Sequence, residues 1–160
     1  MLESGSRTRS DPRKNLVGFL LGGVQYAVDI ARVREIVNPL EVTALPHTPL
    51  EVAGVADHRG EVVPVIDLRV RFGLEPSVGG RTTKWILLNA GGERSVGIIV
   101  DAVTEVFGAI EGIRPTPEVG GNRELRGIAG VVTHNGKLTF VLDISRFVEI
   151  FEALAASGAI

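Results

Sequence analysis

The residues best suited to chemistry in this sequence occur as matched pairs, of which two aspartates form the first. Asp67 and Asp143 each follow an apolar run, and two carboxylates of this kind can act as general acid and general base. Each aspartate also begins a segment containing Leu or Ile that has the pattern of a helix start, where an aspartate caps free N–H groups. Capping accounts better for both residues, so we predict no catalytic pair.

Two histidines form the second pair. His58 and His134 could bind a metal ion together, but no third ligand recurs at a useful spacing, so we interpret them as turn residues. The absence of cysteine excludes disulfides, thiolate metal sites and a cysteine nucleophile. The Gly-Gly pairs lie outside nucleotide-binding motifs, and no serine nucleophile elbow is present. We therefore predict no catalytic residue, no metal and no cofactor.

Two other charged residues have unusual surroundings. Glu35 lies within the apolar segment Val33-Arg34-Glu35-Ile36-Val37, and Arg59 lies at the tip of an expected hairpin. From spacing alone, both are best explained as exposed polar positions on half-buried strands.

An internal repeat explains why these residues occur in pairs. Gly54-Val55 and Ile66-Asp67 return 76 positions later (130 − 54) as Gly130-Val131 and Leu142-Asp143. Upstream, Glu35 is matched 70 positions later (105 − 35) by Glu105. A self-match at a fixed period predicts two copies of one supersecondary unit packed against each other. Halves of about 70 residues are marginal alone, so we expect a shared hydrophobic seam.

The repeated unit has the pattern of β-hairpins. Apolar runs at 16–21 and 24–28 flank Gly22-Gly23, and the same pattern returns at 85–88 and 95–100. A short helical turn running into a strand is expected at 29–37. In the later hairpin of the second copy, Asn135-Gly136 is a strong two-residue turn signal. Arg59 stands at the equivalent position and tolerates positive φ poorly, which favours a different turn in the first copy.

Composition predicts a single globular domain. Of 160 residues, 44% are hydrophobic and 22% charged, which gives enough apolar surface for a core. We predict an all-β fold of small barrels with short helical turns and a C-terminal helix, over the following ranges: a polar tail at 1–14, one domain at 15–152 with repeat halves of about 16–73 and 84–151, and a C-terminal helix end at 153–160.

Charge and hydropathy limit the kinds of partner. The net charge of −2 gives no general attraction to nucleic acid or acidic membranes. The first residues contain no apolar leader, and no later stretch is long and apolar enough to span a bilayer. We therefore expect a cytoplasmic protein that does not insert into the membrane.

Several short motifs follow one another along the chain in a fixed order. They include Val33-x-Glu35-Ile36, Gly54-Val55-x-x-x-Arg59-Gly60, Val63-Pro64-Val65-Ile66-Asp67-Leu68-Arg69 and Gly97-x-x-Val100-Asp101-x-Val103. Together, from about Leu16 to Phe151, they resemble CheW, the family of bacterial chemotaxis coupling proteins. The resemblance implies two pseudo-symmetric, five-stranded SH3-like β-barrels that share a hydrophobic core.

The resemblance also implies a non-enzymatic adaptor and its two partners. Proteins of this family connect the cytoplasmic tip of methyl-accepting chemoreceptors to the regulatory domain of the histidine kinase CheA. The expected location is therefore the cytoplasm, with recruitment to membrane receptor arrays.

Candidate binding residues come from matching the motifs. The Glu of Val-x-Glu-Ile and the Arg of Arg-Gly are similar to a salt-bridged pair near the family's receptor-binding groove. The implied receptor-binding set is Val33, Glu35, Ile36, Arg59, Val103 and Val106. The implied kinase-binding set is Gly54, Val55, Asp57, His58, Arg59 and Gly60, where glycines would let another backbone approach closely.

The chain departs from the family pattern at one point, which keeps other functions open. Asp57-His58 precedes Arg59-Gly60, where the family usually has Asn-Leu. This departure favours, as an alternative, a divergent adaptor that binds receptors without coupling to the kinase and acts as a spacer or competitor. A small-barrel ligand-binding module and an enzyme are the remote alternatives.

Overall fold

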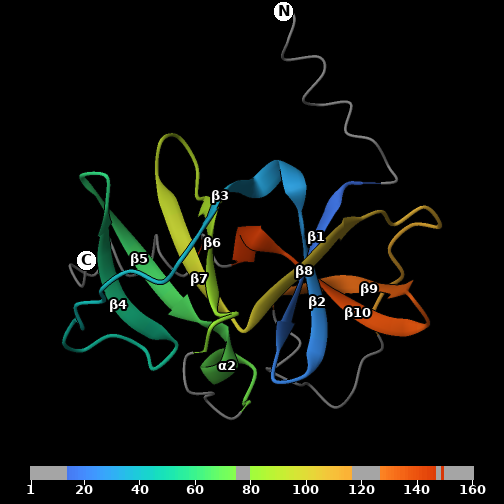
Figure 1. Ribbon diagram of the computed structural model, residues 1–160, viewed down its shortest axis with the longest axis horizontal. Helices are drawn as coiled ribbons and strands as arrows, with labels where there is room; N and C mark the ends of the chain where they lie inside the picture. The colour runs from blue at the N-terminus through green and yellow to red at the C-terminus, as the bar shows by residue number, and fades with distance from the viewer. Residues whose placement is uncertain (1–13, 75–79, 117–126, 147–148, 150–160) are drawn as a thin grey trace, which may run out of the picture.

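Two five-stranded β-barrels make up the described part of the chain. The computed structural model describes residues 14–74, 80–116, 127–146 and 149. Barrel 1, on the right of Figure 1, has the strand order β8 (Ala102–Phe107), β1 (Leu16–Leu21), β2 (Val24–Asp29), β10 (Lys137–Leu142) and β9 (Ile128–His134). Barrel 2, on the left, has the order β3 (Val33–Val37), β6 (Lys84–Asn89), β7 (Ser95–Val100), β5 (Glu61–Asp67) and β4 (Val52–His58). The predicted fold class is confirmed.

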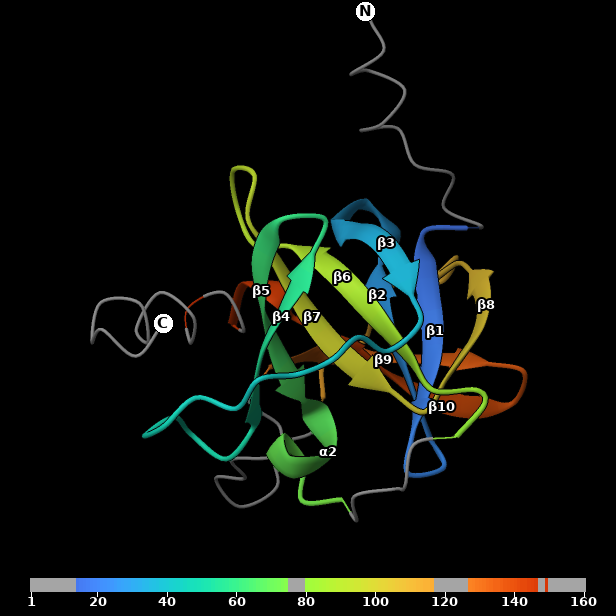
Figure 2. The same cartoon turned by 60° about the vertical axis from the view of Figure 1, so that its left-hand side comes forward.

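The two copies of the repeat exchange their first hairpins. The hairpin β1–β2 of the first copy joins barrel 1, whose other strands β8, β9 and β10 come from the second copy. The hairpin β6–β7 of the second copy joins β3, β4 and β5 of the first copy in barrel 2. The exchanged hairpins attach through the parallel pairs β2–β10 and β7–β5 and through the antiparallel pairs β1–β8 and β6–β3 (Figure 2). The boundary between the barrels is therefore not the boundary between the repeats.

This exchange explains why the central strands are apolar on both faces. Along β1, Phe19 faces the large core cluster that both barrels share, whereas Leu16 faces a smaller cluster inside barrel 1. Along β6, Ile86 faces the shared cluster and Trp85 faces the interior of barrel 2. Successive side chains of a strand point to opposite faces, so each strand supplies one barrel interior and the shared core. The expected hydrophobic seam is this shared cluster.

Short capped helical turns connect the strands where the sequence predicts them. The 3-10 turn η1 (Ile30–Arg32) leads from β2 of barrel 1 into β3 of barrel 2, and Asp29 Oδ1 caps it by accepting a hydrogen bond from the Ala31 N–H at 2.9 Å. Helix α2 (Leu68–Arg71) follows β5, and Asp67 caps it. Residues 144–146 are helical after Asp143; the rest of the predicted C-terminal helix, except for helical residue 149, lies outside the described residues, as do 1–13 and 153–160.

The turn expected to differ between the two copies is the same in both. Arg59 has φ 54° and Gly60 has φ 85°, while Asn135 has φ 52° and Gly136 has φ 74°. The expectation of a different first turn was therefore wrong. A left-handed arginine costs about 1–2 kcal/mol, which the contacts of the hairpin must offset. Among these contacts, Asp57 Oδ1 accepts a hydrogen bond from the Gly60 N–H at 2.9 Å.

Two buried glycines let the links between strands close the barrels. In barrel 2, Thr43 and Val55 exchange backbone hydrogen bonds of 2.8 and 2.9 Å beside Gly54. A Cβ atom on Gly54, which has φ +148°, would lie 2.2 Å from the Thr43 carbonyl oxygen. In barrel 1, Gly130 is in the same position, 2.4 Å from the Arg114 carbonyl oxygen. At both positions a backbone segment occupies the space that a side chain would need.

A small ion network ties the two barrels together. Asp101 lies between β7 of barrel 2 and β8 of barrel 1, and its Oδ2 accepts a hydrogen bond of 2.7 Å from the N–H of Gly22 in the β1–β2 turn. Its Oδ1 lies 3.4 Å from Nη1 of Arg69, whose side chain is 8% exposed. Asp67 holds the same guanidinium through Nε and Nη2, both at 2.9 Å. The hydrogen bond to Asp67 raises the pKa of Arg69 although burial opposes it, so Arg69 stays charged.

Tyr26 gives a direct test of core burial, because it is the only tyrosine in the chain. It stacks on Phe19 and Phe72, with ring centroids 5.9 and 5.3 Å apart, and burial raises its pKa above 10.0. We expect an ultraviolet absorbance titration of the native protein to give a midpoint above that of the urea-unfolded chain. The unfolded phenol ionises first, so the contribution of Tyr26 to stability is constant below pH about 10 and falls as pH rises through the native pKa.

The control for this titration is Tyr26→Phe, which should lack the tyrosine signal and the loss of stability that Tyr26 causes. A native midpoint equal to that of the unfolded chain would contradict the burial of the phenol.

Candidate functional site

The candidate site begins with Glu35 on the edge strand β3. Its carboxylate reaches the tip of the β4–β5 hairpin at the other edge of barrel 2. Glu35 Oε2 lies 3.1 Å from Nη2 of Arg59, and Oε1 lies 3.5 Å from Nε2 of His58. The structure thus brings Glu35 of one sequence motif into contact with His58 and Arg59 of another. The glutamate clamps the hairpin tip against the opposite edge of the barrel.

The Arg59 end of this clamp faces solvent. The Arg59 side chain is 75% exposed, against 33% for Glu35 and 16% for His58. An ion pair this exposed contributes only about 0–1 kcal/mol to stability. The contact therefore fixes the position of the guanidinium more than it stabilises the fold. The Arg59 guanidinium is thus a positive charge held at a fixed place on the surface of barrel 2.

Barrel 1 contains a second clamp that the sequence analysis missed. Glu105 on β8 accepts a hydrogen bond from Nδ2 of Asn135 at 3.1 Å, and its Oε1 lies 2.7 Å from Nε2 of His134. The His134 ring also stacks on Phe107, with ring centroids 3.8 Å apart. The signal was present in the sequence, because Glu105, His134 and Asn135 are the repeat partners of Glu35, His58 and Arg59.

The two clamps differ in charge. Arg59 is the cation of the first clamp, whereas neutral Asn135 takes its place in the second. The first clamp thus differs from its counterpart in barrel 1 at the residue that is most exposed.

The apolar residues of the predicted receptor-binding set divide into two kinds. Val33 and Val103 are half-buried and pack against the shared core. Ile36 and Val106 are exposed, at 41% and 45% of their surfaces. Each kind has one member on β3 of barrel 2 and one on β8 of barrel 1. Of these four residues, only Ile36 and Val106 offer large apolar surfaces to a partner.

The predicted kinase-binding set also divides by exposure. Gly54 is buried, and the backbone that approaches it closely is that of Thr43 in the same chain. Val55 is half-buried and pairs with Thr43. Asp57, Arg59 and Gly60 are exposed, and half-buried His58 faces Glu35. The surface that this set can offer is therefore the hairpin tip rather than its base.

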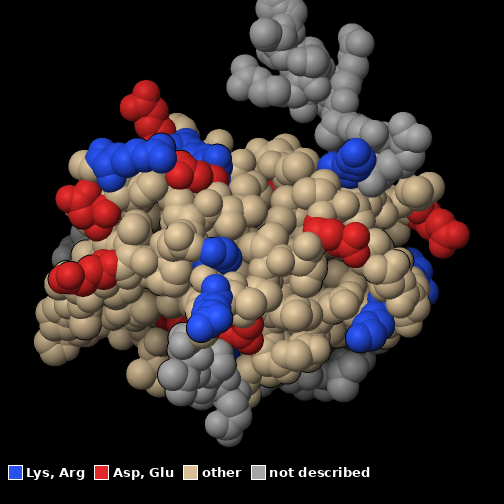
Figure 3. Space-filling model, viewed as in Figure 1, with Lys and Arg blue, Asp and Glu red and all other residues tan. Residues whose placement is uncertain are grey.

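The surface charge of this face is mixed. Figure 3 shows acidic and basic side chains interspersed over the face seen in Figure 1, and they meet at the upper left, over the β4–β5 hairpin and the β6–β7 turn. No broad area of one sign covers the part of this face that the structure describes. Such a surface suits specific protein contacts rather than general attraction to a polyanion.

The pairs first considered for chemistry have structural contacts. Asp67 Oδ1 accepts a hydrogen bond from the Arg69 N–H at 3.0 Å, and Asp143 Oδ1 from the Ser145 N–H at 3.1 Å. Capping is therefore confirmed for both aspartates. His58 and His134 lie in different barrels, each beside its own glutamate. Within the described ranges, no group of three His, Asp or Glu residues could hold a metal ion.

The lengths of the described helices are relevant to whether they could span a membrane. None of them has the length and apolar character needed to cross a bilayer.

Comparison with known proteins gives consistent matches over most of the chain. The profile of the CheW-like domain family matches residues 15–152. A probable chemotaxis protein CheW of Rhizobium etli is 32% identical over 145 residues, which cover 89% of this chain and 92% of that protein. The chemotaxis protein CheW of Klebsiella aerogenes is 36% identical over 129 residues, covering 80% and 77% of the two chains.

A solved structure supports the same relationship. The crystal structure of the scaffolding protein TtCheW from Thermoanaerobacter tengcongensis superposes with a TM-score of 0.75 at 31% identity. The match covers 85% of this chain and 92% of that chain.

Proposed function

Because this chain belongs to the CheW-like domain family, we propose that it is a non-enzymatic adaptor that couples chemoreceptors to a CheA-type histidine kinase. Its partners are the cytoplasmic tip of methyl-accepting chemoreceptors and the regulatory domain of the kinase. It acts in the cytoplasm, at membrane receptor arrays. The observation that carries the proposal is the Glu35–Arg59 contact, which fixes an exposed cation at the tip of the β4–β5 hairpin.

The fold suits this task because a coupler must hold two binding faces at a constant separation. The shared core and the exchanged hairpins make the two barrels parts of one hydrophobic unit. We assign the receptor to the surface near Glu35 and Arg59, with Val33, Ile36, Val103 and Val106 as apolar contacts for a receptor helix. We assign the kinase to the hairpin at Asp57–Gly60, supported at its base by Gly54 and Val55.

The direct test is co-sedimentation with each partner. The purified protein is mixed separately with receptor-tip fragments and with the kinase regulatory domain. It should co-sediment with each of them. A protein that bound neither partner would contradict the proposal.

Reversing the charge of Glu35 should weaken receptor binding without unfolding the protein. In Glu35→Lys, the lysine would face Arg59 and His58, and repulsion would release the hairpin tip. We expect at least about tenfold weaker binding of the receptor tip. The free energy of unfolding should change by about 1 kcal/mol or less, because the contact is exposed. Isothermal titration calorimetry and urea denaturation measure the two effects.

The repeat supplies the matched control for this variant. Glu105→Lys reverses the charge of the equivalent residue in barrel 1, next to His134 and Asn135. It should weaken binding of the receptor tip much less than Glu35→Lys does, although Val103 and Val106 flank Glu105 on β8. If Glu35→Lys unfolded, or if both variants lost binding equally, the assignment of the receptor site to the first clamp would be wrong.

The Asp57-His58 departure favours a second candidate, an adaptor that binds receptors but does not couple the kinase. The hairpin geometry weighs against it. Asp57 Oδ1 accepts a hydrogen bond from the Gly60 N–H, and the side-chain oxygen of an asparagine at this position could accept the same hydrogen bond. His58 contacts Glu35. Adding the protein to reconstituted receptor arrays separates the two: a coupler raises receptor control of kinase activity, whereas a spacer or competitor lowers it.

A further inference from the structure

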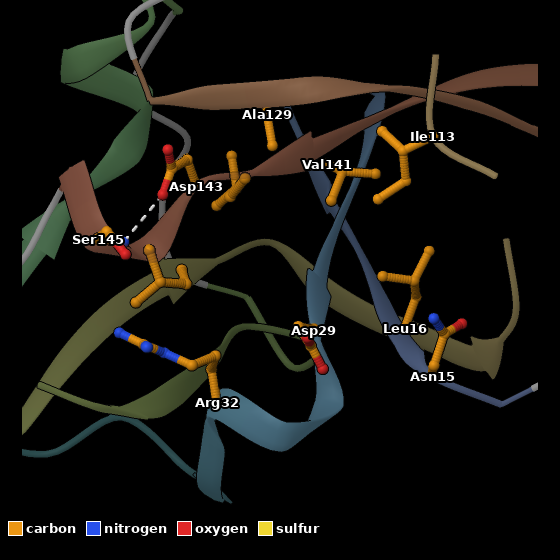
Figure 4. A pocket seen from close by; sticks show the side chains of 11 residues that line it. Asn15, Leu16, Asp29, Arg32, Ile113, Ala129, Val141, Asp143 and Ser145 are labelled. Atoms are coloured by element: carbon orange, nitrogen blue, oxygen red, sulfur yellow. Dashed lines mark hydrogen bonds between the residues drawn. The ribbon is translucent and has the colours of Figure 1, made fainter. Parts of the chain in front are cut away.

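A pocket of about 250 Å3 lies beside η1, where the chain passes from barrel 1 to barrel 2. The start of β1, the end of β10 and Ile113 of the β8–β9 link complete its walls (Figure 4). None of its lining residues belongs to the receptor-binding or kinase-binding set. The pocket is therefore separate from the clamp.

Unpaired charge is the unusual property of this pocket. Arg32 lines it, and its buried Nε has no hydrogen-bond partner. Asp29 and Asp143 line the same pocket, and each uses Oδ1 to accept a backbone N–H of its own turn. Among the described residues, neither carboxylate forms an ion pair with Arg32. The Nε itself is enclosed, so an acceptor in the pocket would pair with the terminal nitrogens of the guanidinium and supply the counter-charge that Arg32 lacks.

Polar and apolar side chains share the walls of the pocket. Figure 4 shows Arg32, Asp143 and Ser145 on one side and Ile113, Val141 and Leu16 on the other, with Asn15 beside Leu16 and Asp29 between the two sides. The volume equals that of about eight water molecules at about 30 Å3 each, so the occupant has on the order of eight to ten non-hydrogen atoms. A ligand that fits has a small charged head and a short alkyl chain.

The charges select a zwitterionic head. A lone carboxylate would pair with Arg32 but meet two aspartates, whereas a lone amine would leave the Arg32 guanidinium without a counter-charge. We propose that this pocket binds a free aliphatic α-amino acid of the size of valine or leucine. Its carboxylate pairs with Arg32, its ammonium group faces Asp29 and Asp143, and its alkyl chain packs on Leu16 and Val141.

Titration of the full chain with leucine and two analogues tests the ligand class. 4-Methylpentanoate lacks the ammonium group, and 3-methylbutylamine lacks the carboxylate. Leucine should shift the NMR signals of Arg32 Nε–Hε and the Ile113 methyl groups saturably, with a dissociation constant on the order of 1 mM. Each analogue should bind at least about tenfold more weakly. Analogue affinities equal to that of leucine, or no saturable shift at ten times that leucine concentration, would overturn the proposal.

Three variants locate the site. Arg32→Gln removes the cation, and Ala129→Leu fills the pocket from an exposed lining position while it keeps the cation. Both should weaken leucine binding at least about tenfold. Arg34→Gln is the control, because Arg34 lies two residues away and donates to the carbonyl oxygens of Gly92 and Glu93 at 2.6 and 2.7 Å. It should bind leucine normally. Unchanged affinity in a folded Arg32→Gln protein would refute the site.

Discussion

Replacing Gly54 with alanine is expected to lower the free energy of unfolding by about 3 kcal/mol, because two costs act at one buried position. The new Cβ would lie 2.2 Å from the Thr43 carbonyl oxygen and 2.8 Å from Cγ1 of Val42. Moving away would break the backbone bridge between Thr43 and Val55, which closes barrel 2. The φ of +148° adds strain for any L side chain. Urea denaturation followed by the fluorescence of the only tryptophan, Trp85, which is buried in barrel 2, measures the loss.

The control for this prediction is Gly60→Ala in the same hairpin. Gly60 also has a positive φ of 85°, but a Cβ there would meet nothing within 4 Å. It should therefore cost only about 1 kcal/mol, the price of the left-handed conformation alone. Equal losses in Gly54→Ala and Gly60→Ala would show that the close approach of Thr43 is unimportant.

The strands and the shared core could be predicted from the sequence. Apolar runs broken by Gly22-Gly23 and Gly91-Gly92 mark the β1–β2 and β6–β7 hairpins, because these glycines adopt positive φ in tight turns. Asp29, Asp67 and Asp143 mark the helical turns, because a capping carboxylate acts within two or three residues. These signals are local, so the sequence displays them directly.

The exchange of hairpins could not be predicted in the same way. The two copies have the same order of elements, so the hairpin β1–β2 has the right pattern to pair with the later strands of either copy. The choice depends on the parallel pairs β2–β10 and β5–β7 and the antiparallel pairs β1–β8 and β3–β6, all of which join residues far apart in the sequence. Periodicity reports which residues are buried but not which strand lies beside them.

The candidate site could be predicted only in part, because it too depends on contacts between residues far apart in the sequence. Resemblance to a family, rather than spacing, joined Glu35 to Arg59, because the two edges of barrel 2 meet only when the barrel closes. The clamp of Glu105 with His134 was missed for that reason, although the repeat placed both residues in register with the first clamp. The turn at Arg59 was misjudged from its intrinsic preference. The intrinsic preference of arginine takes no account of two contacts that support this turn. They are the tertiary contact of Arg59 with Glu35 and the local hydrogen bond from the Gly60 N–H to Asp57.

The inter-barrel ion network should be a main source of stability outside the apolar core. Arg69→Met removes the charge that Asp67 and Asp101 share while it keeps most of the apolar side chain. Removing one member of a buried ion pair costs about 3–5 kcal/mol, because the remaining charges are left in a poorly solvated place. We expect a loss of about 4 kcal/mol in urea denaturation. Asp101 would also repel Asp67 across the junction of the barrels.

Two further variants separate the lost charge from the lost packing. Arg59→Met removes an arginine whose side chain is 75% exposed and pairs with Glu35 at 3.1 Å, and should cost about 1 kcal/mol or less. Asp67→Asn combined with Arg69→Met removes one of the two stranded carboxylates and keeps a residue that can cap α2, so it should regain part of the loss. If Arg69→Met were no more harmful than Arg59→Met, the inter-barrel ion network would add no stability beyond that of an exposed ion pair. If instead the double variant recovers stability, the main cost in Arg69→Met is the pair of carboxylates left facing each other between the barrels.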